Sequence, residues 1–251
     1  MPALPQGLLT VPIAHRGLHG VGVPENTLAA ARAAIAAGYA IECDIQPAAD
    51  GTPMVFHDAE MMRLTGQPGL VSDSDPASLA QARVLGSDQP IPTLAAFLGL
   101  VAGQVPLLVE IKDQDGACGH DIGTLHLRVA EALADYAGPV AVMSFNPHVV
   151  AGFHRAAPRI AVGLTSCAFP EADWPAIRPA RRVELAALAD FDRSGASFVS
   201  HDHTDLANPR IDALRAQGVP ILCWTIRSAE QERAARAVAH NITFEGYAPA
   251  L

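Results

Sequence analysis

A repeated alternation of short apolar segments with alanine-rich segments limits the folds that are open to this chain. The apolar segments have the length and composition of buried strands. They are PIAH, YAIECDI, LLVEI, VAVMSF, IAVGLT, SFVSH, PILCWTI and NITFEG. Strands that alternate with helices form parallel sheets, and a series of eight predicts an α/β fold of the TIM (β/α)8 barrel type. A doubly wound open sheet remains the alternative.

Helix signals mark the segments between these strands. Asn26 or Thr27 is a candidate N-cap, and Asn146 and Asn208 each precede a proline, which is favoured at the first helical position. A chain of 251 residues is long enough for one barrel, so one domain over residues 1–251 is expected.

A further strand candidate, PMVFH at residues 53–57, follows the tight-turn signal Asp50-Gly51. A parallel barrel strand needs a crossover of about a dozen residues, so this segment is expected to fold back on the second strand as an antiparallel hairpin flap. The flap would bring His57 to the barrel rim. Residues 59–92, rich in Gly, Pro, Ser and Asp, are expected to form a small insertion that covers the top of the barrel.

Charge and composition exclude several classes of protein. The net charge of −9, with no basic cluster, argues against binding to nucleic acid or to an anionic membrane surface. No segment has the pattern of a membrane span or of a signal peptide, so a cytoplasmic protein is expected. The four cysteines lie far apart without a CxxC pair, which predicts neither a disulfide framework nor a zinc cluster. Nothing in the sequence fixes the oligomeric state.

Acidic side chains gather at the predicted strand ends, where TIM barrels carry their catalytic groups. Residues two apart on a strand face the same side, so Glu42 and Asp44 point together into the barrel mouth. Glu110 and Lys112 do the same on the next strand. Three converging carboxylates would repel each other without a cation. Oxygen ligands suit a hard divalent ion, which indicates Mg²⁺ or Ca²⁺, with Mn²⁺ as a third candidate.

Seven short motifs follow one another along the chain: AHRG, PENT, ECDI, VFHD, IPTL, VEIK and CWTI. In order and approximate spacing they resemble the motifs of the glycerophosphodiester phosphodiesterase family, one of the TIM-barrel phosphodiesterases that are similar to phosphatidylinositol phospholipase C. The resemblance extends from about residue 13 to residue 245. It implies metal-dependent hydrolysis of small glycerophosphodiesters to sn-glycerol 3-phosphate and an alcohol, with a place in glycerol and lipid metabolism.

The resemblance also implies roles for individual residues. The metal ligands of the family correspond to Glu42, Asp44 and Glu110. The cations that hold the phosphate correspond to Arg16 and Lys112. The metal and these two cations would stabilise charge on the non-bridging phosphate oxygens.

The acid and the base of the family correspond to His15 and His57. Hydrolysis of a phosphodiester needs one group that removes a proton from the attacking oxygen and another that protonates the leaving alkoxide. Imidazole is suited to both tasks near neutral pH.

Three residues of the matching motifs fit two interpretations each. Trp224 is interpreted as a contact for the glycerol or head group, against simple core filling. Asn26 fits a contact with the site and a helix N-cap equally well. Glu25 is interpreted as a first-turn acid that the helix dipole favours rather than as a partner of a site residue.

Two segments depart from the family pattern. Many members end the last strand with Thr-Asp-Arg-Pro, whereas this chain has Phe244 and Glu245 there, which would alter the rim near the substrate. The cluster SHDHTDL, which contains His201, is not a general feature of the family. A solvated polar loop is the favoured interpretation, with head-group selection or a second ion as the alternative.

Two alternatives to hydrolysis of water-soluble diesters stay open. One is a related phosphodiesterase that acts on lysophospholipid or phosphoinositide. The other is a barrel that has lost its activity and serves as a binding module, which the intact set of histidines and carboxylates argues against. A metal amidohydrolase is disfavoured, because such barrels carry His-x-His at the end of the first strand and this chain has His-Arg-Gly.

Overall fold

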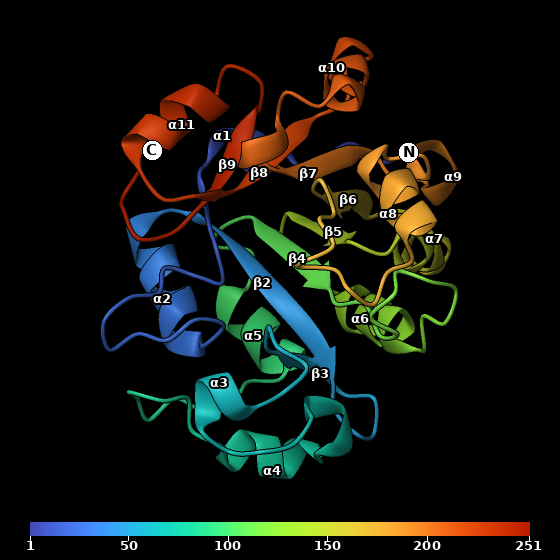
Figure 1. Ribbon diagram of the computed structural model, residues 1–251. Helices are drawn as coiled ribbons and strands as arrows, with labels where there is room; N and C mark the ends of the chain where they lie inside the picture. The colour runs from blue at the N-terminus through green and yellow to red at the C-terminus, as the bar shows by residue number, and fades with distance from the viewer.

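Eight parallel strands close into a barrel in the computed structural model, which describes residues 1–251 (Figure 1). β1 completes the ring by pairing with β2 on one side and with β9 on the other. The barrel strands are β1 Ile13–Ala14, β2 Ala40–Pro47, β4 Leu107–Ile111, β5 Val140–Ser144, β6 Ala161–Ser166, β7 Phe198–Asp202, β8 Ile221–Ile226 and β9 Asn241–Phe244. The predicted TIM barrel is confirmed, and the open sheet is excluded because the ring leaves no free edge.

Helices surround the ring (Figure 1). They are α1 Gln6–Thr10, α2 Leu28–Ala37, α5 Leu94–Val101, α6 Leu125–Leu133, α7 Pro147–Ala156, α8 Pro179–Ala186, α9 Phe191–Ser194, α10 Pro209–Ala216 and α11 Ala229–Ala235. The side chains of Thr27, Asn146 and Asn208 each accept a hydrogen bond from a first-turn amide, as expected of N-caps. No helix has both the length and the apolar character that a membrane crossing requires.

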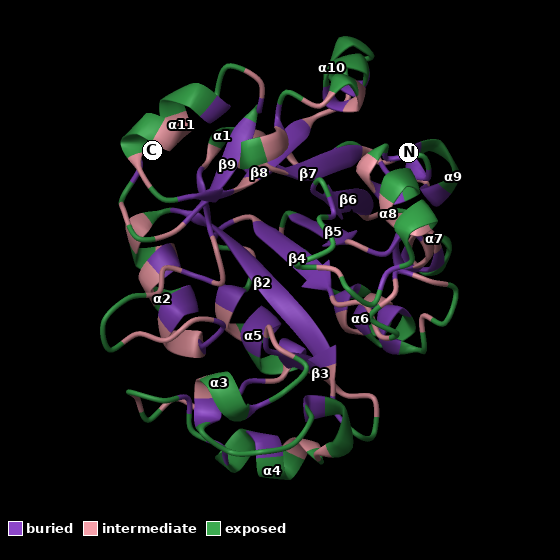
Figure 2. Cartoon of the chain, viewed as in Figure 1, coloured by how far each residue is buried: buried purple, intermediate pink, exposed green.

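Two apolar layers hold the barrel together, and the strands between them are almost entirely buried (Figure 2). The larger layer lies between the strands and the surrounding helices. The smaller layer fills the amino-terminal end of the barrel, where Leu8 of α1 packs with Leu108 and Phe198. All four cysteines are buried and free.

On β2 and β4 the inward face changes from apolar to polar along the strand. On β2, Ala40 belongs to the core at the amino-terminal end, whereas Glu42 and Asp44 line a cavity at the other end. On β4, Leu108 and Glu110 divide in the same way. Alternate residues of a strand share a face. The inward face therefore supplies core residues at its amino-terminal end and site residues at its carboxyl end.

A short strand, β3 (Pro53–Val55), pairs antiparallel with β2 and leads into residues 59–92. This segment contains α3 (Met62–Thr65), the 3-10 turn η1 (Val71–Asp73) and α4 (Pro76–Gln81). It packs on β3 through a small core of its own. α3 and α4 therefore lie at the edge of the barrel (Figure 1). The expectation that this segment covers the barrel mouth is wrong, since none of its residues lines the cavities found there.

A glycine inside the barrel gives a test of this packing. Gly163 on β6 lies opposite Phe198 on β7, and a β-carbon at Gly163 would lie 2.4 Å from the phenyl ring. We expect Gly163→Ala to lower the free energy of unfolding by about 1–3 kcal/mol, because the buried ring must shift. Gly99→Ala is the control: this exposed position inside α5 has open space around it, so a gain of up to about 1 kcal/mol is expected in urea unfolding.

Candidate active site

Three buried carboxylates meet at the carboxyl ends of β2 and β4. Asp44 and Glu110 are register partners across the two strands, and Glu42 lies two residues before Asp44 on the same face. One oxygen from each lies within 4.8 Å of one from each of the others. The structure therefore brings together the three residues that the sequence marks as metal ligands.

Cations compensate part of this charge. Lys112 Nζ lies 2.7 Å from Asp44 Oδ1 and 2.5 Å from Glu110 Oε1, and Arg16 Nε lies 3.4 Å from Asp44 Oδ2. Burial by itself would raise the pKa of Asp44, but Lys112, His57 and Arg16 outweigh it and hold that pKa well below its usual range. Lys112, expected to face the phosphate, lies between two carboxylates in this structure.

Glu42 is the least compensated member of the cluster. Its Oε2 accepts a hydrogen bond of 2.9 Å from the backbone N–H of Arg16, but its Oε1 is buried without any partner. Burial, and then the charges of Asp44 and Glu110, raises the pKa of Glu42 well above its usual value. A buried oxygen without a partner is costly, so the donor set of Glu42, Asp44 and Glu110 fits a divalent cation.

A carboxylate orients the first histidine. His15 Nδ1 lies 2.6 Å from Glu245 Oε2, and Arg227 Nε donates to the other oxygen of Glu245 at 2.8 Å. Because a carboxylate only accepts, Nδ1 of His15 carries the hydrogen and Nε2 is left facing the cluster, 4.0 Å from Glu42 Oε2. Burial lowers the pKa of His15, and the hydrogen bond to Glu245 acts in the opposite direction.

The second histidine is oriented in the same manner. His57 Nδ1 lies 2.7 Å from Asp58 Oδ1, which leaves its Nε2 without a protein partner. Arg63 of α3 binds the same carboxylate, and its Nε donates a hydrogen bond of 2.6 Å to Asp58 Oδ2. Burial would raise the pKa of Asp58, but the hydrogen bonds from His57 and Arg63 hold it well below the usual range.

Arg63 also joins the two sides of the site. Its guanidinium donates to both oxygens of Glu25, and Oε1 of Glu25 accepts a hydrogen bond of 2.7 Å from Arg16. Glu25 is thus a partner of site residues, and its interpretation as a simple first-turn acid is wrong. Sequence reasoning missed Arg63 and Asp58, although Asp58 stands in the VFHD motif directly after His57.

Asn26 holds Asp44 of the carboxylate cluster through two hydrogen bonds. Its Nδ2 donates to Asp44 Oδ2 at 2.8 Å, and its Oδ1 accepts from the backbone N–H of Asp44 at 3.2 Å. Asn26 has a positive φ of 56°, a conformation that asparagine tolerates better than most residues. The N-cap of α2 is Thr27, so the N-cap interpretation of Asn26 is wrong. With 2% exposure, Asn26 can touch Asp44 but has almost no surface for a substrate.

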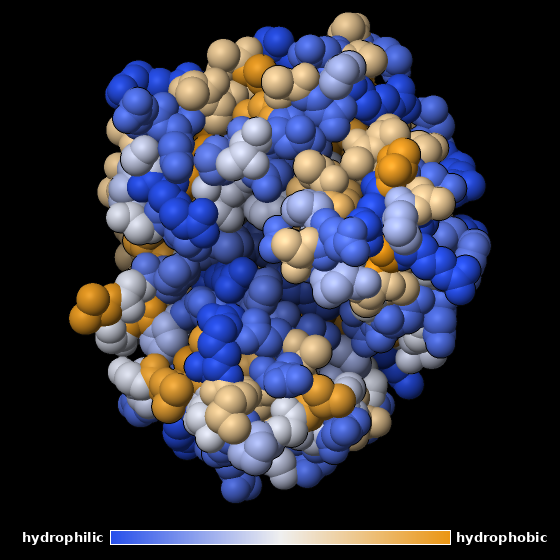
Figure 3. Space-filling view, in the orientation of Figure 1, coloured by the Kyte–Doolittle hydropathy of each residue, from blue (hydrophilic) through white to orange (hydrophobic).

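A cavity of about 180 Å³ opens over the cluster and is bordered by both histidines. Arg16, Lys112 and Trp224 also line it. In the space-filling view the centre of the barrel face is hollowed and its wall is mainly hydrophilic (Figure 3). One cavity is therefore lined by carboxylates, cations and two oriented imidazoles, which are the groups that hydrolysis of a phosphodiester would need.

His201 is not part of this arrangement. It is fully buried, its Nδ1 lies 2.7 Å from Ser166 Oγ, and its Nε2 lies 3.0 Å from Asp205 Oδ2. Both ring nitrogens therefore have partners inside the protein. The expectation of a solvated loop is wrong for His201, and so is the expectation that it contacts the substrate. The alternation along β7 is the signal that indicates this, since Ser200 and Asp202 share the opposite face.

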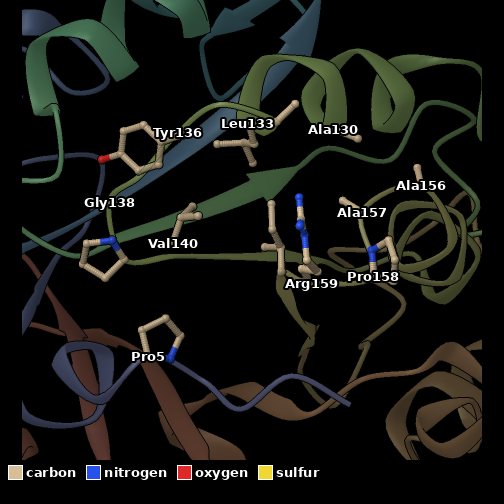
Figure 4. Close-up of a pocket in the computed structure, with 13 residues that line it drawn as sticks. Pro5, Ala130, Leu133, Tyr136, Gly138, Val140, Ala156, Ala157, Pro158 and Arg159 are labelled. Atoms are coloured by element: carbon tan, nitrogen blue, oxygen red, sulfur yellow. The ribbon is translucent and has the colours of Figure 1, made fainter.

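A separate hollow of about 440 Å³ lies at the other end of the barrel (Figure 4). Pro5, Val140 and Pro158 line it together with the end of α6. Arg159 is its one charged residue. It contains no carboxylate and no histidine, so it lacks the residue types that are gathered at the carboxylate cluster.

Comparison with known proteins agrees with the resemblance seen in the sequence. The model of the glycerophosphoryl diester phosphodiesterase family matches residues 15–242. A glycerophosphodiester phosphodiesterase of Caldanaerobacter subterraneus is 28% identical over 242 residues, which cover 91% of this chain and 90% of that protein.

Solved structures show the same fold. A phosphodiesterase of Oleispira antarctica, in complex with the product sn-glycerol-3-phosphate, superposes with a TM-score of 0.77 at 23% identity over 95% of this chain and 94% of the other. A glycerophosphodiester phosphodiesterase of Thermotoga maritima gives a TM-score of 0.70 at 20% identity over 93% and 94% of the two chains. At this level of identity the structures establish the barrel and no more.

Proposed function

Because the chain belongs to the glycerophosphoryl diester phosphodiesterase family, we propose that it hydrolyses glycerophosphodiesters to sn-glycerol 3-phosphate and an alcohol at the cavity described above. The observation that carries this proposal is the pair of histidines. His15 and His57 each have a carboxylate at Nδ1, border one cavity and face one acidic cluster. Carboxylates at Nδ1 fix the tautomer and leave Nε2 for proton transfer.

Glu42, Asp44 and Glu110 would hold the divalent cation, for which Mg²⁺, Ca²⁺ and Mn²⁺ are the candidates. When bound, such a cation supplies positive charge beside the phosphate oxygens. Arg16 contributes further positive charge and is held in place by Glu25 and Asp44. The four free cysteines suit a reducing compartment, which supports a cytoplasmic location.

A wider cleft, lined by residues that include His57, Trp174 and Asp202, lies beside the cavity. We assign the proton transfers from the position of each histidine relative to this cleft. His57 borders both spaces, whereas His15 borders the inner cavity alone. If the leaving alcohol lies in the wider cleft, Nε2 of His57 protonates its oxygen as the phosphorus–oxygen bond breaks. Nε2 of His15 would be the base that takes the proton from the attacking oxygen as that oxygen bonds to phosphorus.

The direct test is release of sn-glycerol 3-phosphate from glycerophosphocholine and glycerophosphoethanolamine. The assay is run with EDTA and then with added Mg²⁺, Ca²⁺ or Mn²⁺, and wild type is compared with His15→Ala. We expect metal-dependent release that disappears in the variant. Activity on lysophospholipid or phosphoinositide alone would favour the lipid alternative. Binding without hydrolysis in any metal would favour the binding module.

Arg63 gives a sharper test of how the site is held. Arg63→Met is expected to lower kcat about 10- to 100-fold with a smaller change in KM, because the residue positions His57 and Arg16 without touching substrate. Arg63→Lys should restore only part of the rate, since an ammonium lacks the planar set of donors with which the guanidinium reaches both oxygens of Asp58 and of Glu25. Arg83→Met, at an exposed arginine of the same insertion, is the matched control and should leave kcat unchanged. Full kcat in Arg63→Met would show that the bridge has no role in catalysis.

A further inference from the structure

A wider cleft of about 630 Å³ lies beside the cavity that contains the carboxylate cluster. His57, Glu110, Lys112, Phe145 and Trp224 border both spaces, so the two are continuous. A diester whose phosphorus lies at the cluster must place its two alcohol groups on different sides of it. The cleft is the larger space available to one of them.

One wall of this cleft is aromatic. The ring centroid of Phe145 lies 4.9 Å from that of Trp174 and 5.6 Å from that of Trp224. Trp224 Nε1 donates to the backbone oxygen of Ser200 at 3.0 Å, which fixes its indole. All three rings are half-buried and line the cleft, so they offer ring surface to whatever enters. Aromatic faces carry negative potential and attract alkylammonium groups.

The charged residues of the cleft point to the same ligand. Asp202 and Asp173 both line it, and neither forms an ion pair. Oδ1 of Asp202 accepts hydrogen bonds from the N–H and the hydroxyl of Thr204, which leaves Oδ2 free. The one Lys or Arg on this cleft is Lys112, and Asp44 and Glu110 hold it. An anionic head group would therefore meet uncompensated carboxylates, and a neutral one would leave their charge unbalanced.

We infer that this cleft selects diesters whose leaving alcohol carries an alkylammonium cation, of the choline or ethanolamine type. The inference rests on the proposed function and adds the chemical class of the head group. Trp174, Trp224 and Phe145 would contact the methyl or methylene groups around the nitrogen. Asp202 and Asp173 would balance its charge.

The kinetic test compares glycerophosphocholine with its 3,3-dimethylbutyl isostere, in which carbon replaces nitrogen and the shape is kept. We expect kcat/KM to favour the cation by about tenfold or more in wild type. The double variant Asp173→Asn with Asp202→Asn should lose most of this preference, because kcat/KM should fall much more for glycerophosphocholine than for the isostere. Trp174→Leu should also lower the preference for the cationic diester. Asp135→Asn is the matched control, because Asp135 is exposed beyond the end of α6 and forms no ion pair.

A binding test does not depend on hydrolysis. Both tryptophans of the chain line this cleft, so intrinsic fluorescence reports on its occupant. Tetramethylammonium chloride should give a saturable change that sodium chloride at equal ionic strength does not, and the double aspartate variant should weaken it. Equal kcat/KM for the two diesters would overturn the head-group inference and leave the proposed function standing. Hydrolysis of neither would overturn the proposed function, and a saturable or absent fluorescence response would then decide the inference alone.

Discussion

Replacing His57 with alanine is expected to lower kcat/KM for a diester with an alkyl leaving group by about 10²–10⁴-fold. The reason is that an alkoxide leaves slowly unless an acid protonates it, and His57 is the histidine that borders the wider cleft. In contrast, p-nitrophenol leaves as a stable anion and does not need to be protonated. The same variant should therefore lose much less activity on glycerophospho-p-nitrophenol.

His15→Ala should behave differently, with a similar loss on both substrates, because the attacking oxygen must be deprotonated whatever group leaves. The measurement is kcat/KM for the two esters in wild type and in both variants. His120→Ala, at an exposed histidine away from the cavity, is the control and should change neither value. The opposite pattern, with His15→Ala rescued by the better leaving group, would exchange the two roles.

The second large effect is expected from Glu42→Gln. This change keeps the shape and the acceptor for the backbone N–H of Arg16, but it removes one charge from the cluster. A metal contribution of several kcal/mol predicts a fall in kcat/KM of at least about a thousandfold. Binding of the metal, measured by calorimetry with Mg²⁺, Ca²⁺ and Mn²⁺, should weaken in parallel.

Stability should move in the opposite direction. Burial and two neighbouring carboxylates oppose ionisation of Glu42, so the metal-free variant should melt at a higher temperature than metal-free wild type. The rise in Tm that added metal gives wild type should be lost. Glu60→Gln, at an exposed position of the insertion without an ion pair, should retain both the activity and the metal-dependent rise. A variant with normal activity and a normal metal-dependent Tm would remove Glu42 from the site.

Short-range patterns account for the parts of the site that the sequence predicts well. The spacing Glu42-x-Asp44 on a strand of period two places both carboxylates on the inward face, and the structure shows them there. The turn Asp50-Gly51 similarly predicts the antiparallel return that carries His57 to the cavity. These features depend on a few neighbouring residues, so they can be seen without the fold.

Residues that act through distant partners were harder to interpret. The His-x-His pattern around His201 resembles a ligand site, but its place on β7 turns it away from the cavity. Asn26 looks like an N-cap until its left-handed backbone and its two hydrogen bonds to Asp44 are seen. Arg63 stands in a segment that the sequence marks only as irregular, and its contacts with Asp58 and Glu25 depend on how that segment packs.

The contact between Glu245 and His15 depends on tertiary structure and not on local sequence pattern. Strand periodicity and turn chemistry act over a few residues, so they predict the barrel, the strand ends and the identity of the carboxylate cluster from the chain alone. Only the closure of the ring, with β9 beside β1, decided that Glu245 lies 2.6 Å from His15 across 230 residues of chain. Pairings of this kind, like the Arg63 bridge, depend on packing between segments that no local pattern encodes.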